Sequence, residues 1–442
     1  MKRILFVLFL SLAACLADDW PQWFGPQRDG IWRESGILKT FPEGGPKMLW
    51  KRDIGAGYAG PSVKDGKVYL IDRTVEDTST LSGDPFKPGT VPGKERVSCL
   101  DATSGKEIWS HAYASTYTVS YGAGPRCTPV IDDGLVYTLG AEGHLHCLQA
   151  IDGKVVWEKD FLKVFKVKSP GWGFAATPLV EGDQLICLAR GDGSTVVSFD
   201  KKTGAERWRA LTAKEPGYCP PTIIEAEGKR VLIIWHPEAI NGLDPKTGQV
   251  LWSVPWTIRS GLCVPTPRLD GKRLFLTSFY NGATMLEFTS FDKEPKVNWQ
   301  TKRASEKRTE HLNSIIGTPV IKDGHIYGGC SYGQFRCLQV SDGKRLWETM
   351  EPIVKKEERW GNVFVTPHED RYFLFNELGE LLIAKLSPQG YEEISRAKLI
   401  EPNGIDMMRM RTVVWSHPAY ANQNIFVRND TEIRCFSLKA EG

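Results

Sequence analysis

The sequence has little of what marks membrane-spanning, nucleic-acid-binding or motif-bearing catalytic proteins. Its 442 residues carry a formal net charge of only +3, so no global attraction to nucleic acid or to an anionic membrane is expected. Beyond residue 14, no apolar run approaches the length needed to span a bilayer. P-loop, GxSxG and HExxH motifs are absent, which removes motif support for phosphoryl transfer, α/β-hydrolase chemistry and zinc proteolysis.

The ten cysteines are placed in a way that disfavours a disulfide framework. In an exported chain, this many cysteines would ordinarily suggest disulfides. Here Cys99, Cys147, Cys337 and Cys435 recur in one local pattern, a cysteine followed by an apolar residue in a short β-like run. The recurrence predicts small buried hydrophobic side chains instead.

The first residues have the layout of a secretory signal. A positively charged start precedes the apolar residues 4–14, and small residues follow. Two processing routes fit: cleavage after Ala17, or lipid attachment at Cys15, because Leu-Ala-Ala before that cysteine resembles a bacterial lipoprotein box. Leu16 is an unusual residue after a lipidated cysteine, which favours cleavage. Either route predicts an exported protein of the periplasm or cell envelope, lipid-anchored only if Cys15 is modified.

An internal repeat decides the fold class. Two of its copies read TPVIDDGLVYTLGAEGHLHCLQAIDGKVVW and TPVIKDGHIYGGCSYGQFRCLQVSDGKRLW. Each contains alternating runs separated by Asp-Gly or other Gly-containing turns and ends in a tryptophan. This pattern predicts three short strands joined by hairpins, and a fourth around the tryptophan.

Counting the repeats predicts an all-β, eight-bladed β-propeller over residues 44–442. The closing tryptophans recur at spacings of 44 to 51 residues, at Trp109, Trp157, Trp208, Trp252, Trp299 and Trp347. A seventh unit places Ile394 where the tryptophan is expected, and an eighth lacks its fourth strand. The segment around Trp50 has no partners of its own, so it is expected to join the last blade and close the ring, which removes exposed sheet edges. Residues 1–17 are then the signal, and residues 18–43 an N-terminal segment packing on the propeller.

Several elements of the repeat resemble a known family. PSVKDGKVYL, SCLDATSGKEIW and LDPKTGQVLW resemble the pyrroloquinoline-quinone (PQQ) repeat, and DDWPQWFGPQRDGIW resembles the opening of exported PQQ-like propellers. The resemblance covers the chain from about residue 18 onward. It implies the quinoprotein alcohol dehydrogenase-like superfamily, which holds PQQ-dependent dehydrogenases and also the non-catalytic outer-membrane assembly lipoprotein BamB. Fold alone does not choose between these functions.

The segments that precede the innermost strands are the place to look for a site, because they converge on the axis of a propeller. They are rich in glycine, aromatic rings and cations. The candidates for a ligand-binding rim are Tyr58, Tyr121, Arg126, Trp172, Tyr218, Arg259, His311, Asn313, Arg359, Trp360, Asn362, Arg409 and Arg411. Arginines on an aromatic-walled funnel could bind a small anion. The alternative is a polar rim whose arginines pair with acids such as Glu310, Glu357 and Glu358.

Quinone-dependent oxidation would require a carboxylate base and, usually, a divalent cation beside the cofactor. No rim segment offers an evident base; Glu310 and Asp406 are the nearest by position, and the adjacent cysteine pair of several alcohol-oxidising relatives is absent. No catalytic residue is therefore assigned. The sequence favours a binding or scaffolding protein with a protein or carbohydrate partner on a propeller face. The alternative is a PQQ-dependent oxidoreductase of alcohols or sugars with PQQ and calcium.

Two further features have plain structural interpretations. His144 and His146 have the spacing that puts two side chains on one strand face, but other repeats have Gln334 and Arg336 there. We therefore expect an exposed polar face, and no metal. Residues 74–96, rich in Pro, Gly, Ser and Thr, are expected to form a long surface loop of the first blade, either a lid or partner contact or, as we favour, a mobile excursion.

Overall fold

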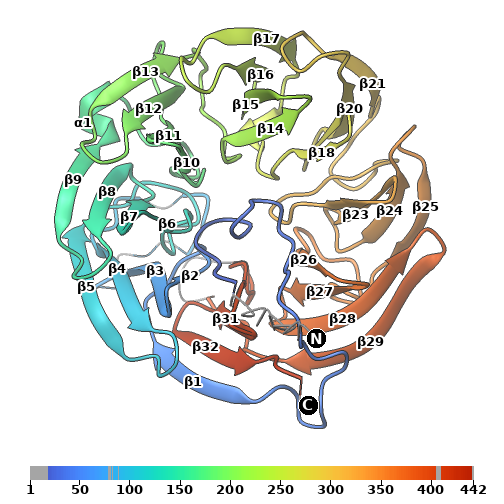
Figure 1. Cartoon of the computed structure of the whole chain (residues 1–442), viewed down its shortest axis with the longest axis horizontal. Helices are drawn as coiled ribbons and strands as arrows, with labels where there is room; N and C mark the ends of the chain where they lie inside the picture. Colours follow the sequence, from blue (N-terminus) through green and yellow to red (C-terminus); the bar gives the residue numbers. More distant parts are fainter. Residues whose placement is uncertain (1–17, 78–80, 82, 88, 405–409, 441–442) are drawn as a thin grey trace, which may run out of the picture.

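The chain forms a ring of eight four-stranded antiparallel sheets (Figure 1). The computed structural model describes residues 18–77, 81, 83–87, 89–404 and 410–440. The signal with Cys15, and also Asp406 and Arg409, lie outside the described residues. The eight-bladed β-propeller predicted from the repeats is confirmed.

Each blade consists of consecutive strands numbered outward from the axis, and the last is completed by β1. Blades 1 and 2 are β2 (Ser62–Lys64), β3 (Lys67–Thr74), β4 (Lys94–Asp101), β5 (Glu107–Ala114) and β6 (Val130–Asp132), β7 (Leu135–Leu139), β8 (His144–Gln149), β9 (Val155–Asp160). Blades 3 and 4 are β10 (Leu179–Glu181), β11 (Gln184–Leu188), β12 (Val196–Asp200), β13 (Glu206–Ala210) and β14 (Thr222–Ala226), β15 (Lys229–His236), β16 (Ala239–Leu243), β17 (Val250–Pro255). Blades 5 and 6 are β18 (Arg268–Asp270), β19 (Arg273–Ser278), β20 (Gly282–Glu287), β21 (Lys296–Gln300) and β22 (Val320–Lys322), β23 (His325–Gly329), β24 (Phe335–Gln339), β25 (Arg345–Thr349). Blades 7 and 8 are β26 (Val363–His368), β27 (Arg371–Asn376), β28 (Glu380–Ser387), β29 (Gly390–Lys398) and β30 (Ala419–Ala421), β31 (Asn424–Arg428), β32 (Glu432–Ser437), β1 (Met48–Asp53).

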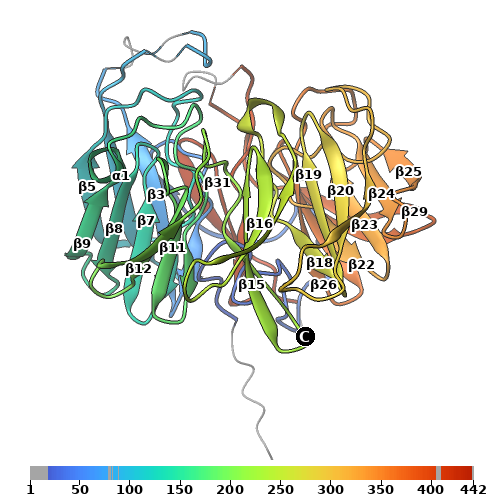
Figure 2. The same ribbon diagram turned by 90° about the horizontal axis from the view of Figure 1, so that it is seen from above.

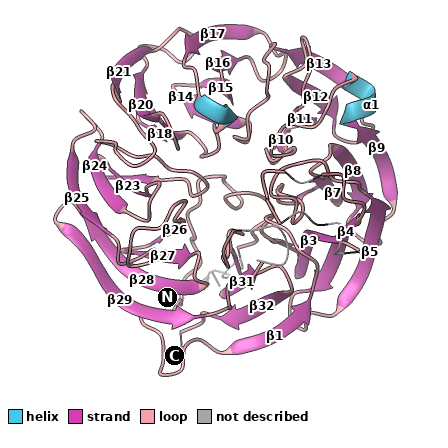
Figure 3. Cartoon of the chain, turned by 180° about the vertical axis from the view of Figure 1, so that it is seen from behind, coloured by secondary structure: helices cyan, strands magenta, loops and turns pink. Residues whose placement is uncertain are grey.

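Helix is scarce in the described part of the chain. It consists of α1 (Phe161–Phe165), capped by the Asp160 carboxylate, and the single 3-10 turn η2 (Arg259–Gly261), both visible in Figure 3. None of the described helices is long and apolar enough to cross a membrane.

The Asp-Gly turns read from the sequence have the geometry that tight hairpins require. Asp65 and Gly66, between β2 and β3, have φ values of 50° and 69°, and Asp133 and Gly134 have 49° and 73°. Two successive positive φ angles match the right-handed twist of the flanking strands, and Asp-Gly tolerates them. In these two blades the turn residues therefore set the register locally.

Ring closure follows the prediction. β1 pairs antiparallel with β32, with Trp50 opposite Cys435 and Asp53 opposite Glu432. The first strand of the chain thus becomes the outermost strand of the last blade.

The hydrophobic core lies in layers between successive blades. Between blades 1 and 2, for example, Cys99 and Trp109 pack in one cluster with Val136 and Leu148. Nine cysteines are described, and all are buried and free, so the reading of the recurrent cysteines as small hydrophobic side chains is confirmed. No disulfide joins blades in the described residues, and closure depends on packing and β1.

The recurrent tryptophans connect six of the eight blades to the next. Trp109 is buried, and its indole N–H donates to the Ala150 carbonyl of the following blade, 3.1 Å away. The same contact is made by Trp50 to Ala102 (2.8 Å), Trp157 to Lys201 (3.1 Å), Trp252 to Phe291 (2.8 Å), Trp299 to Val340 (2.9 Å) and Trp347 to Ser387 (2.8 Å). Trp208 departs from the pattern and donates to Gln184 of its own blade.

One register prediction was wrong. In the seven outer strands that contain the tryptophan, a bulge residue precedes it, as Ile108 precedes Trp109. In blade 7, Ser395 pairs with Ile383 and so takes the place of the tryptophan, whereas Ile394 is the bulge residue and faces outward. In most other repeats the tryptophan lies four residues after a turn glycine, and the same count from Gly390 gave Ile394. The count failed because β28 and β29 stay paired up to Ser387 and Gly390. This glycine therefore has no counterpart in the other repeats.

Gly153 tests the contact between blades. Gly153 and Gly134 have nearly the same left-handed φ, 72° and 73°. A Cβ at Gly153 would lie 2.4 Å from the Trp109 ring, whereas a Cβ at Gly134 would meet nothing within 4 Å. We expect Gly134→Ala to cost about 1–2 kcal/mol in backbone strain, and Gly153→Ala to cost about 1–3 kcal/mol more from overpacking. Equal losses in chemical denaturation would contradict the proposed role of the tryptophan.

The N-terminal segment lies across one face of the ring. Trp20 and Val63 of blade 1 exchange two backbone hydrogen bonds of 2.9 Å, and the Trp32 amide donates to Pro367 of blade 7. The loop between β3 and β4 rises from the opposite face (Figure 2). The two faces therefore differ: one is covered by the N-terminal segment, and the other carries the long loop.

Candidate functional site

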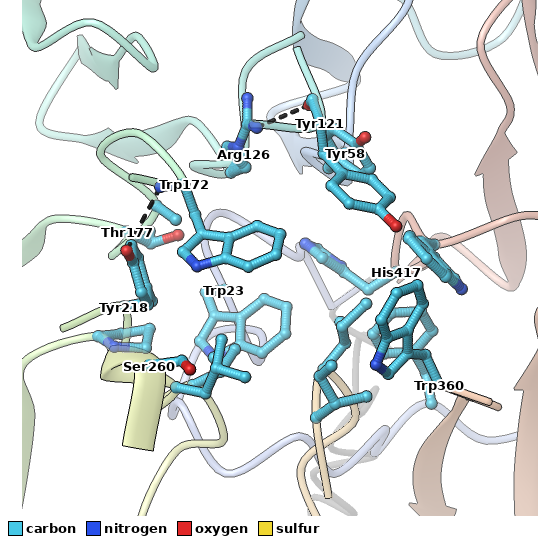
Figure 4. Close-up of a pocket in the computed structure, with 18 of the residues that line it drawn as sticks. Trp23, Tyr58, Tyr121, Arg126, Trp172, Thr177, Tyr218, Ser260, Trp360 and His417 are labelled. Atoms are coloured by element: carbon cyan, nitrogen blue, oxygen red, sulfur yellow. Dashed lines mark hydrogen bonds between the residues drawn. The ribbon is translucent and has the colours of Figure 1, made fainter. Parts of the chain in front are cut away.

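A cavity of about 420 Å³, here called the axial pocket, lies at the centre of the ring (Figure 4). Ten of its lining side chains are aromatic: Trp23, Tyr58, Phe86, Tyr121, Trp172, Tyr218, Tyr280, Trp360, Phe364 and Trp415. The rest are Arg126, Ala175, Thr177, Pro220, Ser260, Leu262, Val264, Ile315, Ile316, Arg359 and His417. A pocket of this size and apolarity is typical of small-ligand sites.

The pocket walls come mainly from the segments before the innermost strands. Two wall residues, Tyr121 and Trp360, have left-handed φ angles of 53° and 64°, which are uncommon for bulky side chains. Their rings meet edge to face with centroids 6.0 Å apart. Such local strain persists only where the surrounding structure determines it, and it recurs at ligand sites.

The rings form a connected wall. Tyr121 packs against Trp172 at 5.6 Å and against Trp415 at 6.1 Å between ring centroids, and Trp415 stacks on Tyr58 at 6.5 Å. These contacts join blades that are far apart in the sequence. The wall is therefore a product of ring closure.

The long loop of blade 1 contributes to the mouth of the pocket. β3 continues to Thr74 and β4 begins at Lys94, so the loop is shorter at both ends than the predicted residues 74–96. Phe86 contacts the rings of Tyr121, Trp172 and Trp360 at centroid distances of 5.3, 5.9 and 6.1 Å. The loop is tied at this point, because the Tyr121 amide donates to the Pro85 carbonyl at 2.9 Å.

Trp23 of the N-terminal segment closes the far end. Its indole N–H donates to Thr266 Oγ1 at 3.0 Å, and its ring meets His417 edge-on at 4.5 Å. A second cavity of about 300 Å³ lies beyond and shares Trp23, Thr177 and Pro220 with the first. The axial pocket is therefore blind on the face that the N-terminal segment covers.

His417, at the floor, is held neutral. Its Nε2 lies 2.6 Å from Thr128 Oγ1 and its Nδ1 lies 3.0 Å from the Pro418 carbonyl, so Nδ1 carries the proton and Nε2 accepts from the hydroxyl. Burial lowers the pKa of His417 to about 4.

The pocket lining contains two cations and no carboxylate. The Arg126 guanidinium donates to the carbonyl oxygens of Gly124, Ser120 and Tyr121 and lies 5.0 Å from the Tyr58 ring, and no carboxylate pairs with it among the described residues. Arg359 pairs with Glu306 instead and lies over the Trp360 ring at 4.3 Å. Only the charge of Arg126 is therefore left without an acidic partner.

The structure brings together half of the predicted rim. Of the ligand-rim candidates, Tyr58, Tyr121, Arg126, Trp172, Tyr218, Arg359 and Trp360 line the axial pocket. Arg259, His311, Asn313, Asn362 and Arg411 do not. The convergence argument places these segments around the axis, but the side of each segment that faces the axis depends on its path.

The remaining candidates have structural partners. His311 is buried against Trp299 and shares a 2.7 Å hydrogen bond with Thr301, and Asn313 donates to the Ser305 carbonyl at 2.8 Å. The Asn362 side chain accepts from the Gly317 amide at 2.7 Å. Arg259 is exposed and lies 4.7 Å from the Tyr280 ring.

Arg411 forms an ion pair with a buried carboxylate beside the pocket. It donates to both carboxylate oxygens of Glu377 at 2.6 and 3.0 Å, and the Trp415 indole donates to the same carboxylate at 3.0 Å. Glu377 has no exposed side-chain surface. Of the three acids suggested as partners of the rim arginines, Glu310 is exposed, Glu357 pairs with Lys307, and Glu358 lies 3.6 Å from Arg411.

Several lining residues were missed from the sequence. Trp415 and His417 lie in the segment that supplied Arg409 and Arg411 as rim candidates, and Phe86 lies in the long loop of blade 1. Trp23 lies outside every repeat. Its aromatic-rich surroundings, WPQWFGPQ, were the only local signal.

The lining does not fit PQQ with calcium. Such a site needs carboxylate ligands for the metal and a carboxylate base for the alcohol, but no aspartate or glutamate lines the axial pocket. The nearest buried acid, Glu377, is engaged by Arg411 and Trp415. The described residues contain no group of three His, Cys, Asp or Glu side chains arranged to hold a metal.

The expectation of an exposed histidine face in blade 2 was wrong. His146 is 4% exposed and packs against Tyr113 at 4.3 Å and His111 at 5.3 Å between ring centroids. β5, the outer strand of blade 1, covers His146 with Tyr113 and His111. The pattern within one repeat does not predict this contact from the neighbouring blade. Burial, with the neighbouring His111 and His144, lowers the pKa of His146 to about 3.

Two of the buried histidines, His417 and His146, predict acid sensitivity. His417 and His146 stay neutral in the folded chain but take up a proton near pH 6.5 when unfolded. The free energy of unfolding should be unaffected above about pH 6.5, and it should fall by about 1.4 kcal/mol per pH unit for each group below it. The loss should continue to about pH 4 for His417 and pH 3 for His146.

Denaturation curves between pH 7.5 and 4.5 measure this effect. His417→Gln and His146→Gln should each flatten the dependence by about 1.4 kcal/mol per pH unit. Curves parallel to the wild type would show that these histidines are not the cause.

Fold and site together define the class: an eight-bladed propeller of PQQ-type repeats with a blind, aromatic axial pocket that lacks a carboxylate. A family model described as outer membrane protein assembly factor BamB matches residues 93–349, more than half of the chain. The chain therefore belongs to the BamB family.

Individual relatives are distant. The chain is 22% identical over 253 residues to the outer membrane protein assembly factor BamB of Moranella endobia (strain PCIT), covering 55% of this chain and 61% of that protein. It is 26% identical over 172 residues to the protein of the same name from Yersinia pestis, covering 38% and 33%. The matches thus span less than two thirds of these curated relatives. The crystal structure of BamB from Moraxella catarrhalis has a TM-score of 0.56 at 15% identity, covering 90% of this chain and 98% of that one, which shows a shared fold.

Proposed function

We propose that this chain is a non-enzymatic assembly factor of the cell envelope that holds a protein partner on one face of its propeller. The observation that carries the proposal is membership of the BamB family, whose curated members named above are outer membrane protein assembly factors. The signal-like first residues support an exported location, with lipid attachment at Cys15 as one route to the membrane.

The chemistry of the axial pocket supports binding over oxidation. Catalysis by a quinone needs an acid–base residue at the reacting atom. The two charged side chains that line the pocket are arginines, and its one imidazole, His417, has both nitrogens engaged. The oxidoreductase alternative has no residue here to carry it.

The face with the pocket mouth is the proposed partner face. The other face is covered by the N-terminal segment, whose Trp20 and Trp32 are buried against the blades. On the mouth side the loop between β3 and β4 presents Phe86, 44% exposed. An exposed aromatic ring beside arginines is a composition typical of interface hot spots.

Envelope fractions of the source organism provide the test. The tagged chain, expressed at its natural level and crosslinked in cells, should capture a component of the outer-membrane assembly machinery, and deletion of the gene should lower the amount of assembled outer-membrane proteins. Phe86→Asp should reduce capture, whereas Ile151→Asp, a substitution at a 75% exposed site in the turn between β8 and β9, should not. Unchanged outer-membrane protein levels together with no captured component would reject the proposal.

A further inference from the structure

The axial pocket has a composition that scaffolding does not explain. Ten aromatic side chains and two arginines line it, with no aspartate or glutamate. Many of these residues, including Trp23, Phe86, Trp360 and Trp415, lie outside the residues 93–349 that match the family. The family match therefore does not account for the whole pocket.

Arg126 gives the pocket a fixed positive charge. Backbone carbonyl oxygens of Gly124, Ser120 and Tyr121 hold its guanidinium in place, but a carbonyl supplies only a dipole and no ionic partner. The side chain is half-buried beside Tyr58 and lines the cavity. A cation held this way is preorganised for a ligand carboxylate, because it need not leave another acid.

The remaining lining determines what carries that carboxylate. Besides the tyrosine and tryptophan side chains, Thr177, Ser260 and His417 supply the uncharged polar groups, and both ring nitrogens of His417 are occupied. A neutral sugar would leave many hydroxyl groups unpaired here, at a cost for each. The flat walls of tryptophan and tyrosine instead suit an aromatic ring, which gains from offset or edge-to-face contacts.

The closed floor determines how the ligand enters. Trp23 blocks the far end, so a polypeptide segment cannot pass through the ring. A small molecule or the end of a chain can reach the tryptophans from the mouth without a second opening. A chain end that carries a free carboxylate is a C-terminus.

We propose that the axial pocket binds an aromatic ring that carries a nearby carboxylate, with the ring among Trp172, Trp360 and Trp415 and the carboxylate on Arg126. The group is either the C-terminal aromatic residue of a polypeptide or a free aromatic acid. If the ligand is a polypeptide C-terminus, this proposal rests on the proposed scaffold function. The binding of an aromatic carboxylate in the pocket does not depend on that function.

Calorimetric titration of the mature wild-type protein tests the chemistry without any variant. The probes are a hexapeptide ending in tryptophan with a free carboxylate, the same peptide amidated, and indole-3-acetate. We expect the free peptide to bind at least about 10-fold more tightly than the amide, the scale of one charge-assisted hydrogen bond. Equal affinities, or no binding of any probe, would overturn the proposal.

Two arginine variants locate the carboxylate. Arg126→Met should abolish the preference for the free peptide over the amide, and Arg126→Lys should keep part of it. Arg190→Gln is the matched control, because that arginine pairs with Glu215 and does not line the pocket, and it should keep the preference. Equal melting temperatures of ligand-free Arg126→Met and Arg126→Lys show that a lost preference is not a folding defect. A preference that survives in Arg126→Met would overturn the assignment.

These experiments also distinguish a polypeptide C-terminus from a free aromatic acid, and they test ligand binding separately from the proposed scaffold function. Free-peptide binding tighter than that of indole-3-acetate assigns the chain end; the reverse assigns the free acid and overturns the polypeptide source. Capture of envelope proteins by Arg126→Met tests the scaffold separately, because loss of peptide binding with normal capture would leave the proposed function intact.

Discussion

Deletion of residues 44–54 is expected to destabilise the whole ring by more than about 5 kcal/mol, because replacing one buried tryptophan alone costs about 3–5 kcal/mol. The deletion removes β1, and with it the pairing to β32 and the Trp50 contact to the next blade. The melting temperature should fall by roughly 10 °C, at about 2 °C per kcal/mol for a large domain. The exposed edge of β32 should also promote aggregation.

Two neighbouring point substitutions provide the matched control. Trp50 is 7% exposed and donates to the Ala102 carbonyl at 2.8 Å, whereas Leu49, the bulge residue beside it, is 41% exposed. Trp50→Ala should cost about 3–5 kcal/mol, and Leu49→Ala should remain within about 0.5 kcal/mol of the wild type. An unchanged melting temperature of the deletion variant would reject closure by β1.

Arg411→Met should cost about 3 kcal/mol at neutral pH, since it leaves the buried Glu377 carboxylate without its cation. Replacing both partners, as Glu377→Leu with Arg411→Met, should recover most of this loss because no buried charge remains. Urea denaturation of the two variants measures the difference. A double variant no more stable than Arg411→Met would contradict the ion-pair explanation.

The pH dependence of this variant gives an independent check. Burial raises the pKa of Glu377 even with Arg411 present, and loss of the arginine should raise it further. A folded-state pKa above the unfolded one makes the folded chain bind the proton more tightly. The deficit of Arg411→Met relative to the wild type should therefore shrink as the pH falls from 7.5 to 5.5.

The fold could be predicted because each blade is specified by local signals. Asp-Gly turns, alternating runs and the closing tryptophan recur at nearly constant spacing, and the incomplete last repeat predicted the role of Trp50. The error at Ile394 arose where the local signal failed, since the tighter hairpin of blade 7 changed the count from Gly390 to the bulge.

The site was predicted less completely because it depends on contacts between repeats. The rim segments were found by their position before the inner strands, and Arg126, Trp172 and Trp360 do line the pocket. His311 comes from an equivalent segment but packs on Trp299 between blades. Neither residue type nor spacing in the sequence tells whether such a side chain lines the pocket or packs between blades.

The sequence by itself determined the number of blades, their strand pairing and the closure of the ring, since hairpin turns and side-chain alternation act over a few residues. Only the tertiary structure decided that Trp23 closes the axis, that Phe86 reaches the mouth, and that Arg126 is left without an acid. These facts depend on where segments from different parts of the chain meet once eight twisted sheets have packed face to face. That packing fixes the direction of each side chain, and no local pattern in the sequence encodes it.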